Sequence, residues 1–144
     1  MIQLTEEMRR LINSARANGN PCIVATASPD GTPNAGFIGT VMAFDGGSLA
    51  YRDRSSRSPL EHIEVNPKVV VLFYNPSQGV GWKFRCTPTV HRDGPVHEQV
   101  MSRLTESGLA LDPAVNGAVL LLQIDQILTL FGEVLQERVP NLRW

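Results

Sequence analysis

The sequence predicts a mainly β protein in which a small antiparallel barrel is flanked by helices. Three observations lead to this class. Most strand-like segments are joined by short turns rich in Gly, Pro, Asp and Asn, as antiparallel hairpins require. Strands and helices do not alternate regularly, which argues against a parallel sheet. Residues 69–74 are continuously apolar and therefore belong inside a closed or doubly covered sheet.

The length and composition favour a single domain over residues 1–144. A chain of 144 residues with 42% hydrophobic content can form one core but not two ordinary ones. The formal net charge of -1 gives no bulk electrostatic attraction to nucleic acid or an anionic membrane. No apolar run reaches the roughly 18 residues that a membrane-spanning helix needs. The charged N-terminal segment lacks the apolar core of a signal peptide, so we expect a cytoplasmic protein.

The first predicted elements are a helix and a hairpin. Residues 5–17 place Thr5 where a helix cap belongs and repeat apolar residues at helical spacing, before residues 18–21 end the helix. Residues 22–27 are apolar and partly β-branched, which is typical of a strand. The turn 28–33 contains Pro and Gly at positions that favour a hairpin. The chain is therefore expected to enter the sheet through an antiparallel pair.

The next strand, predicted over residues 34–44, contains Gly36 and Gly39. Glycine inside a strand weakens it unless a bulge or a close approach of another group requires the missing side chain. Curvature of a small barrel would explain the two glycines. A flat ligand lying against bare backbone would explain them equally well, and both interpretations stay open at this point.

A loop rich in arginine and serine follows the strand that begins at residue 48. Residues 51–58 carry four hydroxyl groups and three guanidinium groups. Pro59 can occupy the first turn of a short helix, which the Asn-Pro pair at 66–67 ends. The free N–H groups at the start of that helix would face the loop and favour an anion such as phosphate. A solvated loop whose arginines pair with nearby carboxylates is the alternative.

The second half of the chain adds strands and a longer helix. Residues 80–92 alternate in part, which predicts a half-buried strand or one that lines a ligand. Residues 95–104 have helical spacing, and residues 119–131 form the last long strand before Gly132. About six or seven strands are expected in all.

Motifs of several common enzyme classes are missing. There is no G-x-x-x-x-G-K-[ST], no G-x-G-x-x-G after a strand and no G-x-S-x-G. His62, His91 and His97 are scattered, so no metal site is expected. Cys22 and Cys86 lie in apolar, strand-like contexts and predict buried free thiols. No side chain stands out as a catalytic acid or base, and the phosphate-competent loop beside a glycine-broken strand is the remaining candidate site.

The order of the segments is the strongest clue to a family. The chain contains A-T-A-x-P-D-G-x-P-N, then D-G-G-x-L-x-Y, the Arg/Ser loop, E-H-I-E-x-N-P-K-V-V-V-L-F-Y and finally W-K-F-R. Over residues 8–131 this order resembles the pyridoxamine 5′-phosphate oxidase-like family of FMN-binding split barrels, especially its short stand-alone members. The resemblance implies a split β-barrel that binds FMN, and a homodimer with the flavin in a cleft between the subunits.

The resemblance also implies which residues bind the flavin. The positions that hold the phosphate correspond to Tyr51, Arg52, Arg57 and Ser58. The strand that passes under the isoalloxazine ring corresponds to Gly36, Phe37, Ile38, Gly39, Thr40 and Val41. Trp82 and Lys83 lie on the strand whose equivalents approach the edge of the ring. The family commonly has Arg-Lys or Ser-Lys where this chain has Arg-Ser, and it has basic phosphate ligands in the glycine strand that this chain lacks.

The implied activity is that of an oxidoreductase, which passes a hydride between a reduced nicotinamide and a small organic acceptor through the flavin. The chain lacks the C-terminal Trp and Arg motif by which the true oxidase holds its substrate, so oxidation of pyridoxamine phosphate is not expected. Two alternatives remain. One is a flavin-binding electron-transfer or sensing protein without substrate chemistry, and the other is a member of the same fold that binds haem or a deazaflavin.

Overall fold

The computed structural model describes residues 1–53, 59–109 and 117–144. Within these ranges, eight strands form one antiparallel sheet in the order β2-β1-β5-β6-β7-β4-β3, and β8 pairs with β7. The strands are β1 (Cys22–Ala27), β2 (Pro33–Ile38), β3 (Met42–Asp45), β4 (Ser48–Asp53), β5 (Val69–Asn75), β6 (Val80–His91), β7 (Ala118–Leu128) and β8 (Val134–Glu137). The helices are α1 (Glu6–Asn13), α2 (Pro59–Val65) and α3 (Gly94–Glu106). The mainly β antiparallel class predicted from the sequence is confirmed.

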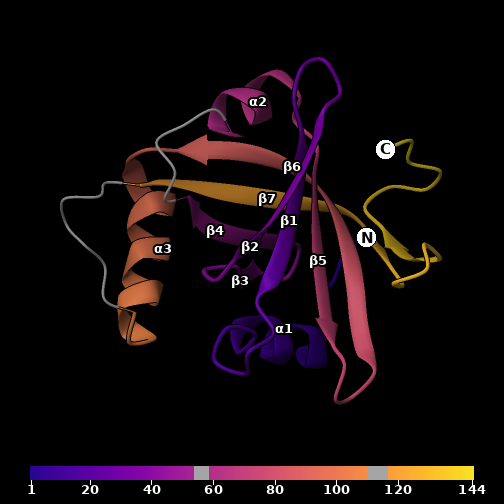
Figure 1. The fold of residues 1–144 in the computed structure, drawn as a ribbon, viewed down its shortest axis with the longest axis horizontal. Coiled ribbons are helices and arrows are strands. Elements are labelled where there is room, and N and C mark those ends of the chain that lie inside the picture. The colour runs from indigo at the N-terminus through magenta and orange to yellow at the C-terminus, as the bar shows by residue number, and fades with distance from the viewer. Residues whose placement is uncertain (54–58, 110–116) are drawn as a thin grey trace.

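The helices lie on different sides of the sheet (Figure 1). In that view α2 is at the top, α1 at the bottom and α3 on the left. The hydroxyl oxygen of Thr5 caps α1 by accepting from the N–H of Met8 at 3.1 Å, as the sequence predicted. The buried face of α1 consists of Met8, Leu11 and Ile12. No helix in the described part of the chain is long and apolar enough to span a membrane.

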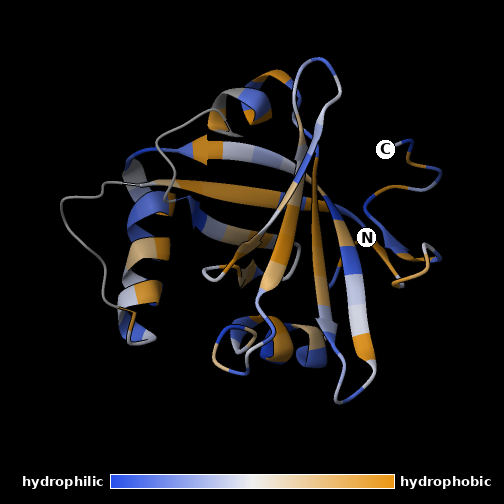
Figure 2. Ribbon diagram, viewed as in Figure 1, coloured by the Kyte–Doolittle hydropathy of each residue, from blue (hydrophilic) through white to orange (hydrophobic). Residues whose placement is uncertain are grey.

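The interior position of β5 confirms the prediction made from its continuous apolar run. It lies between β1 and β6, and Val69, Val71 and Phe73 are almost completely buried. Figure 2 shows apolar residues along β1, β5 and β7, where the main core is formed. Cys22 and Cys86 are free and buried in this core, also as predicted. Burial raises the pKa of the Cys22 thiol to about 12, so the thiol stays protonated and unreactive near neutral pH.

The single strand predicted over residues 34–44 is wrong. The structure divides it into β2, which pairs with β1, and β3, which pairs with β4. These two strands stand at opposite ends of the strand order, yet only residues 39–41 separate them. Because so short a link spans at most about 14 Å, the two ends of the sheet must approach each other there. The break therefore curves the sheet toward closure.

Candidate functional site

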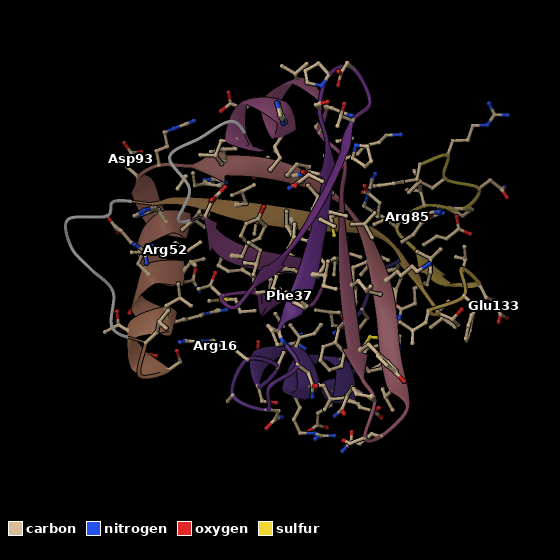
Figure 3. The ribbon with its side chains drawn as sticks, in the orientation of Figure 1. Arg16, Phe37, Arg52, Arg85, Asp93 and Glu133 are labelled. Atoms are coloured by element: carbon tan, nitrogen blue, oxygen red, sulfur yellow. The ribbon has the colours of Figure 1, made fainter. Side chains whose placement is uncertain are left out.

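A pocket of about 450 Å³ opens at this approach of the two sheet ends. It is bounded by β1, β2, the segment 39–40, the end of β4 and Leu109, which follows α3. Figure 3 shows two of its charged side chains, Arg52 next to α3 and Arg16 above α1. We call it the glycine pocket, because Gly36 and Gly39 both line it.

The glycine pocket brings together most of the residues that the sequence assigned to flavin binding. Those that line it are Gly36, Phe37, Ile38, Gly39, Thr40, Tyr51 and Arg52. Val41 lines a neighbouring pocket instead. Arg57 and Ser58 lie outside the described residues, a few positions after Asp53, which itself lines the glycine pocket.

Trp82 and Lys83 line neither of these two pockets. The Trp82 ring stacks on Phe73 of β5, with ring centroids 6.0 Å apart. Lys83 stands between Leu72 of β5 and Leu128 of β7 in the strand register. Within one chain these two residues are therefore not part of the pocket. That they approach the isoalloxazine ring stays a prediction, which would require a flavin bound between two subunits.

One wall of the glycine pocket exposes bare backbone at Gly36. Gly36 pairs with Val24 and Asn34 pairs with Thr26, and all four residues line the pocket. Because paired residues of antiparallel strands point to the same side of the sheet, these positions share one face. A Cβ atom built on Gly36 would meet no heavy atom within 4 Å. The wall therefore has room for a flat group to lie directly against β2.

The opposite wall is fixed by a buried hydroxyl. The register that pairs Met42 with Ala50 would place Thr40 opposite Arg52. There the Thr40 side chain takes over the role of the strand backbone: its Oγ1 accepts from the Arg52 N–H at 3.0 Å and donates to the Arg52 carbonyl at 3.1 Å. Both residues are buried. This pair of bonds holds the segment 39–41 against the end of β4.

Replacing Thr40 with valine should lower the free energy of unfolding by about 2 kcal/mol. Valine keeps the shape but removes this partner from both backbone groups of Arg52, which lie away from water. Thr40→Ser keeps the hydroxyl and should be much closer to the wild type. Urea unfolding of the three proteins checks this, and equal stability of the valine and serine variants would contradict it.

The charged lining suits an anionic group. Arg16 and Arg52 both line the pocket, together with one acidic residue, Asp53. Burial, assisted by the charge of Asp53, raises the pKa of Tyr51 well above its ordinary value. Its hydroxyl therefore stays protonated and can donate a hydrogen bond. Guanidinium and hydroxyl donors are the groups that bind phosphate oxygens in proteins.

Several lining residues could not be found from local sequence patterns. Val24 and Thr26 join the pocket only because β1 pairs with β2 in this register. Arg16 follows α1, and its side chain packs over Gly39, where an added Cβ would lie 3.0 Å from the Arg16 Cδ. No motif marks Arg16, since its position depends on how α1 packs on the sheet.

Comparisons with known proteins give a consistent family and fold. The family model described as pyridoxamine 5′-phosphate oxidase matches residues 4–131. No curated protein is significantly similar in sequence. The structure is similar to that of HupZ from Group A Streptococcus, with 23% identity, a TM-score of 0.76 and coverage of 92% of this chain and 99% of that chain.

Two further solved structures have the same fold. One is an F420 reductase, with 18% identity, a TM-score of 0.67 and coverage of 86% of this chain and 98% of that chain. The other is a pyridoxamine 5′-phosphate oxidase-related, FMN binding protein from Nostoc punctiforme, with 16% identity, a TM-score of 0.63 and coverage of 92% and 89%. At these identities the structural similarity establishes the fold alone, and it agrees with the predicted split barrel.

Proposed function

Because the chain belongs to the pyridoxamine 5′-phosphate oxidase family, we propose that it is an FMN-binding oxidoreductase formed by one domain over residues 1–144. The observation that carries this proposal is the bare wall at Gly36, which stands beside the buried end of β4 in one pocket. A flavin needs a broad slot for its ring and cationic donors for its phosphate. The glycine pocket offers both.

The proposed roles divide between the two walls. Residues 36–40 would lie against the ring, with backbone close enough to donate to its polar edge. Arg52 and Tyr51 would bind the phosphate from the end of β4, joined by Arg57 and Ser58 of the following loop. When bound, FMN supplies hydride or electron transfer, which we propose runs from a reduced nicotinamide to a small organic acceptor.

We also propose that the working form is a homodimer. The strand β2 stands at one end of the strand order, and residues 33–37 are exposed, including Phe37 at 71% of its surface. A flavin against this strand would be covered on one side only, so a second subunit would supply the other wall. Analytical ultracentrifugation should show a dimer, and a monomer that retains FMN tightly would contradict the proposal.

The phosphate assignment is tested by Arg57→Ala. If Arg57 makes a charge-assisted hydrogen bond to the phosphate, FMN affinity should fall by about 1.5–3 kcal/mol, a tenfold to 150-fold weakening. Riboflavin has the ring but no phosphate, so its affinity should not change. Arg92→Ala is a matched control, because Arg92 is exposed and pairs with Glu64 away from the glycine pocket. Equal loss of FMN and riboflavin affinity would show that the loop shapes the fold instead.

A deazaflavin is the second candidate cofactor. One protein of this fold is an F420 reductase, and F420 is a deazaflavin with the same flat ring shape. Mass spectrometry of the cofactor released from the purified protein distinguishes the two, and a sharp Soret absorption band would identify haem instead. Steady oxidation of NADH or NADPH by the loaded protein would separate an enzyme from a simple electron carrier.

A further inference from the structure

A second pocket, of about 760 Å³, adjoins the glycine pocket between α1, the segment 39–44 and α3. We call it the arginine pocket, because Arg9, Arg16 and Arg103 line it. Arg9 and Arg16 come from the N-terminal part of the chain and Arg103 from α3, so only the fold brings them to one pocket. Among the described residues, no aspartate or glutamate lines this pocket.

The positive charge of the arginine pocket is not balanced locally. The described part of the chain contains two ion pairs, Arg92 with Glu64 and Arg138 with Asp125, and neither involves a lining arginine. The whole chain has a formal net charge of -1, so three arginines that line one pocket are a local excess of positive charge. Such an excess attracts an anion, because a bound negative charge also relieves the repulsion among the arginines.

One of these guanidinium groups is held in place before any ligand binds. Arg103 Nη1 donates to the Phe44 carbonyl at 2.8 Å, and the guanidinium lies 4.9 Å from the centre of the Phe44 ring. A fixed donor loses little conformational freedom when it binds an anion, which favours affinity.

Apart from the arginines, the wall combines the polar side chains of Asn13, Thr40 and Ser107 with apolar surface. Met42 and Leu104 are buried and contribute to its wall, and Val41 and Phe44 add further apolar surface. A lining of this kind favours a ligand with a compact apolar body over a free inorganic ion. Charge and apolar surface together define a small organic anion.

We propose that the arginine pocket binds a small organic anion, whose carboxylate or phosphate group is recognised by Arg9, Arg16 and Arg103. The two pockets share Arg16, Gly39, Thr40 and Leu109. A ligand here would therefore lie next to the ring, as the electron-accepting substrate. Only that role rests on the proposed function, since binding of the anion does not require a flavin.

Binding is tested by titrating the protein with benzoate and phenyl phosphate, followed by amide chemical shifts in NMR spectra. At least one anion should bind with a dissociation constant of about 1 mM or below, and the neutral probe benzyl alcohol should not. The perturbed amides should include those of Arg9, Leu104 and Ser107. Comparing the two anions identifies the preferred charged group.

Arg9→Gln should weaken this binding roughly tenfold by removing one charge-assisted hydrogen bond. Arg10→Gln is the matched control, because Arg10 is exposed on the same helix and does not line the pocket. Arg9 lines only the arginine pocket, so FMN affinity should be the same in Arg9→Gln and the wild type.

The inference is overturned if neither anion binds, if benzyl alcohol binds as tightly as benzoate, or if Arg10→Gln weakens binding as much as Arg9→Gln. Failure of the proposed function gives a different result: the anions bind as expected, but the protein has no affinity for FMN.

Discussion

Replacing Gly36 with valine should weaken FMN binding roughly 150-fold and leave the fold intact. A Cβ at this position points into open space, and valine would fill the part of the glycine pocket where the ring is proposed to lie. Overpacking of this kind costs about 3 kcal/mol, so FMN affinity should fall roughly 150-fold. Gly36 does not have a positive φ, and valine is a good strand former, so stability should not decrease. Fluorescence titration with FMN and urea unfolding measure the two effects.

Ala35→Val is the matched control for this variant. Ala35 is the neighbouring residue of β2, is exposed and does not line the glycine pocket. Valine there adds a similar volume to the same strand and should leave FMN affinity close to that of the wild type. If Gly36→Val binds FMN as well as Ala35→Val does, the glycine serves the curvature of the sheet and not the ligand.

The sequence predicted those features whose signal is local. The run of residues 69–74 is apolar on both faces, and only an interior strand such as β5 has that requirement. The cap at Thr5 was predictable because the hydroxyl acts within one turn. Gly36 was noticeable as a glycine within a strand, and the end of β4 was noticeable for its tyrosine and arginine. The fold brings them into one pocket.

Other features depend on contacts that are distant in the sequence. The predicted strand 34–44 is interrupted because its two halves pair with different strands, β1 and β4. The spacing of apolar residues along the sequence does not show that the pairing partner changes. Arg9 and Arg103 line one pocket only because α1 and α3 both pack near β3. In the sequence alone they are unrelated charged residues. Gly81 is a further example. Like Gly36 it precedes an aromatic residue within a strand, but the sequence does not show that their surroundings differ.

Gly81→Ala should destabilise the fold by about 3 kcal/mol, although alanine adds only one methyl group. An added Cβ would lie 2.4 Å from the Phe73 carbonyl oxygen and 2.9 Å from the Leu130 Cδ2. The leucine side chain can rotate away, but the carbonyl belongs to the backbone of β5, which pairs with β6 at this point. The two strands would have to separate, and the stacked pair of Phe73 and Trp82 lies directly beside the contact.

Gly36→Ala provides the comparison, because it makes the same chemical change within another strand of the same sheet. Alanine at Gly36 meets no neighbour, and removing a glycine from a strand should raise the free energy of unfolding by about 0.5–1 kcal/mol. The two variants should therefore shift the midpoint of urea unfolding in opposite directions. Equal shifts would mean that the close approach at Gly81 is relieved without separating β5 from β6. The room available for a Cβ atom would then not explain the difference expected between the two glycines.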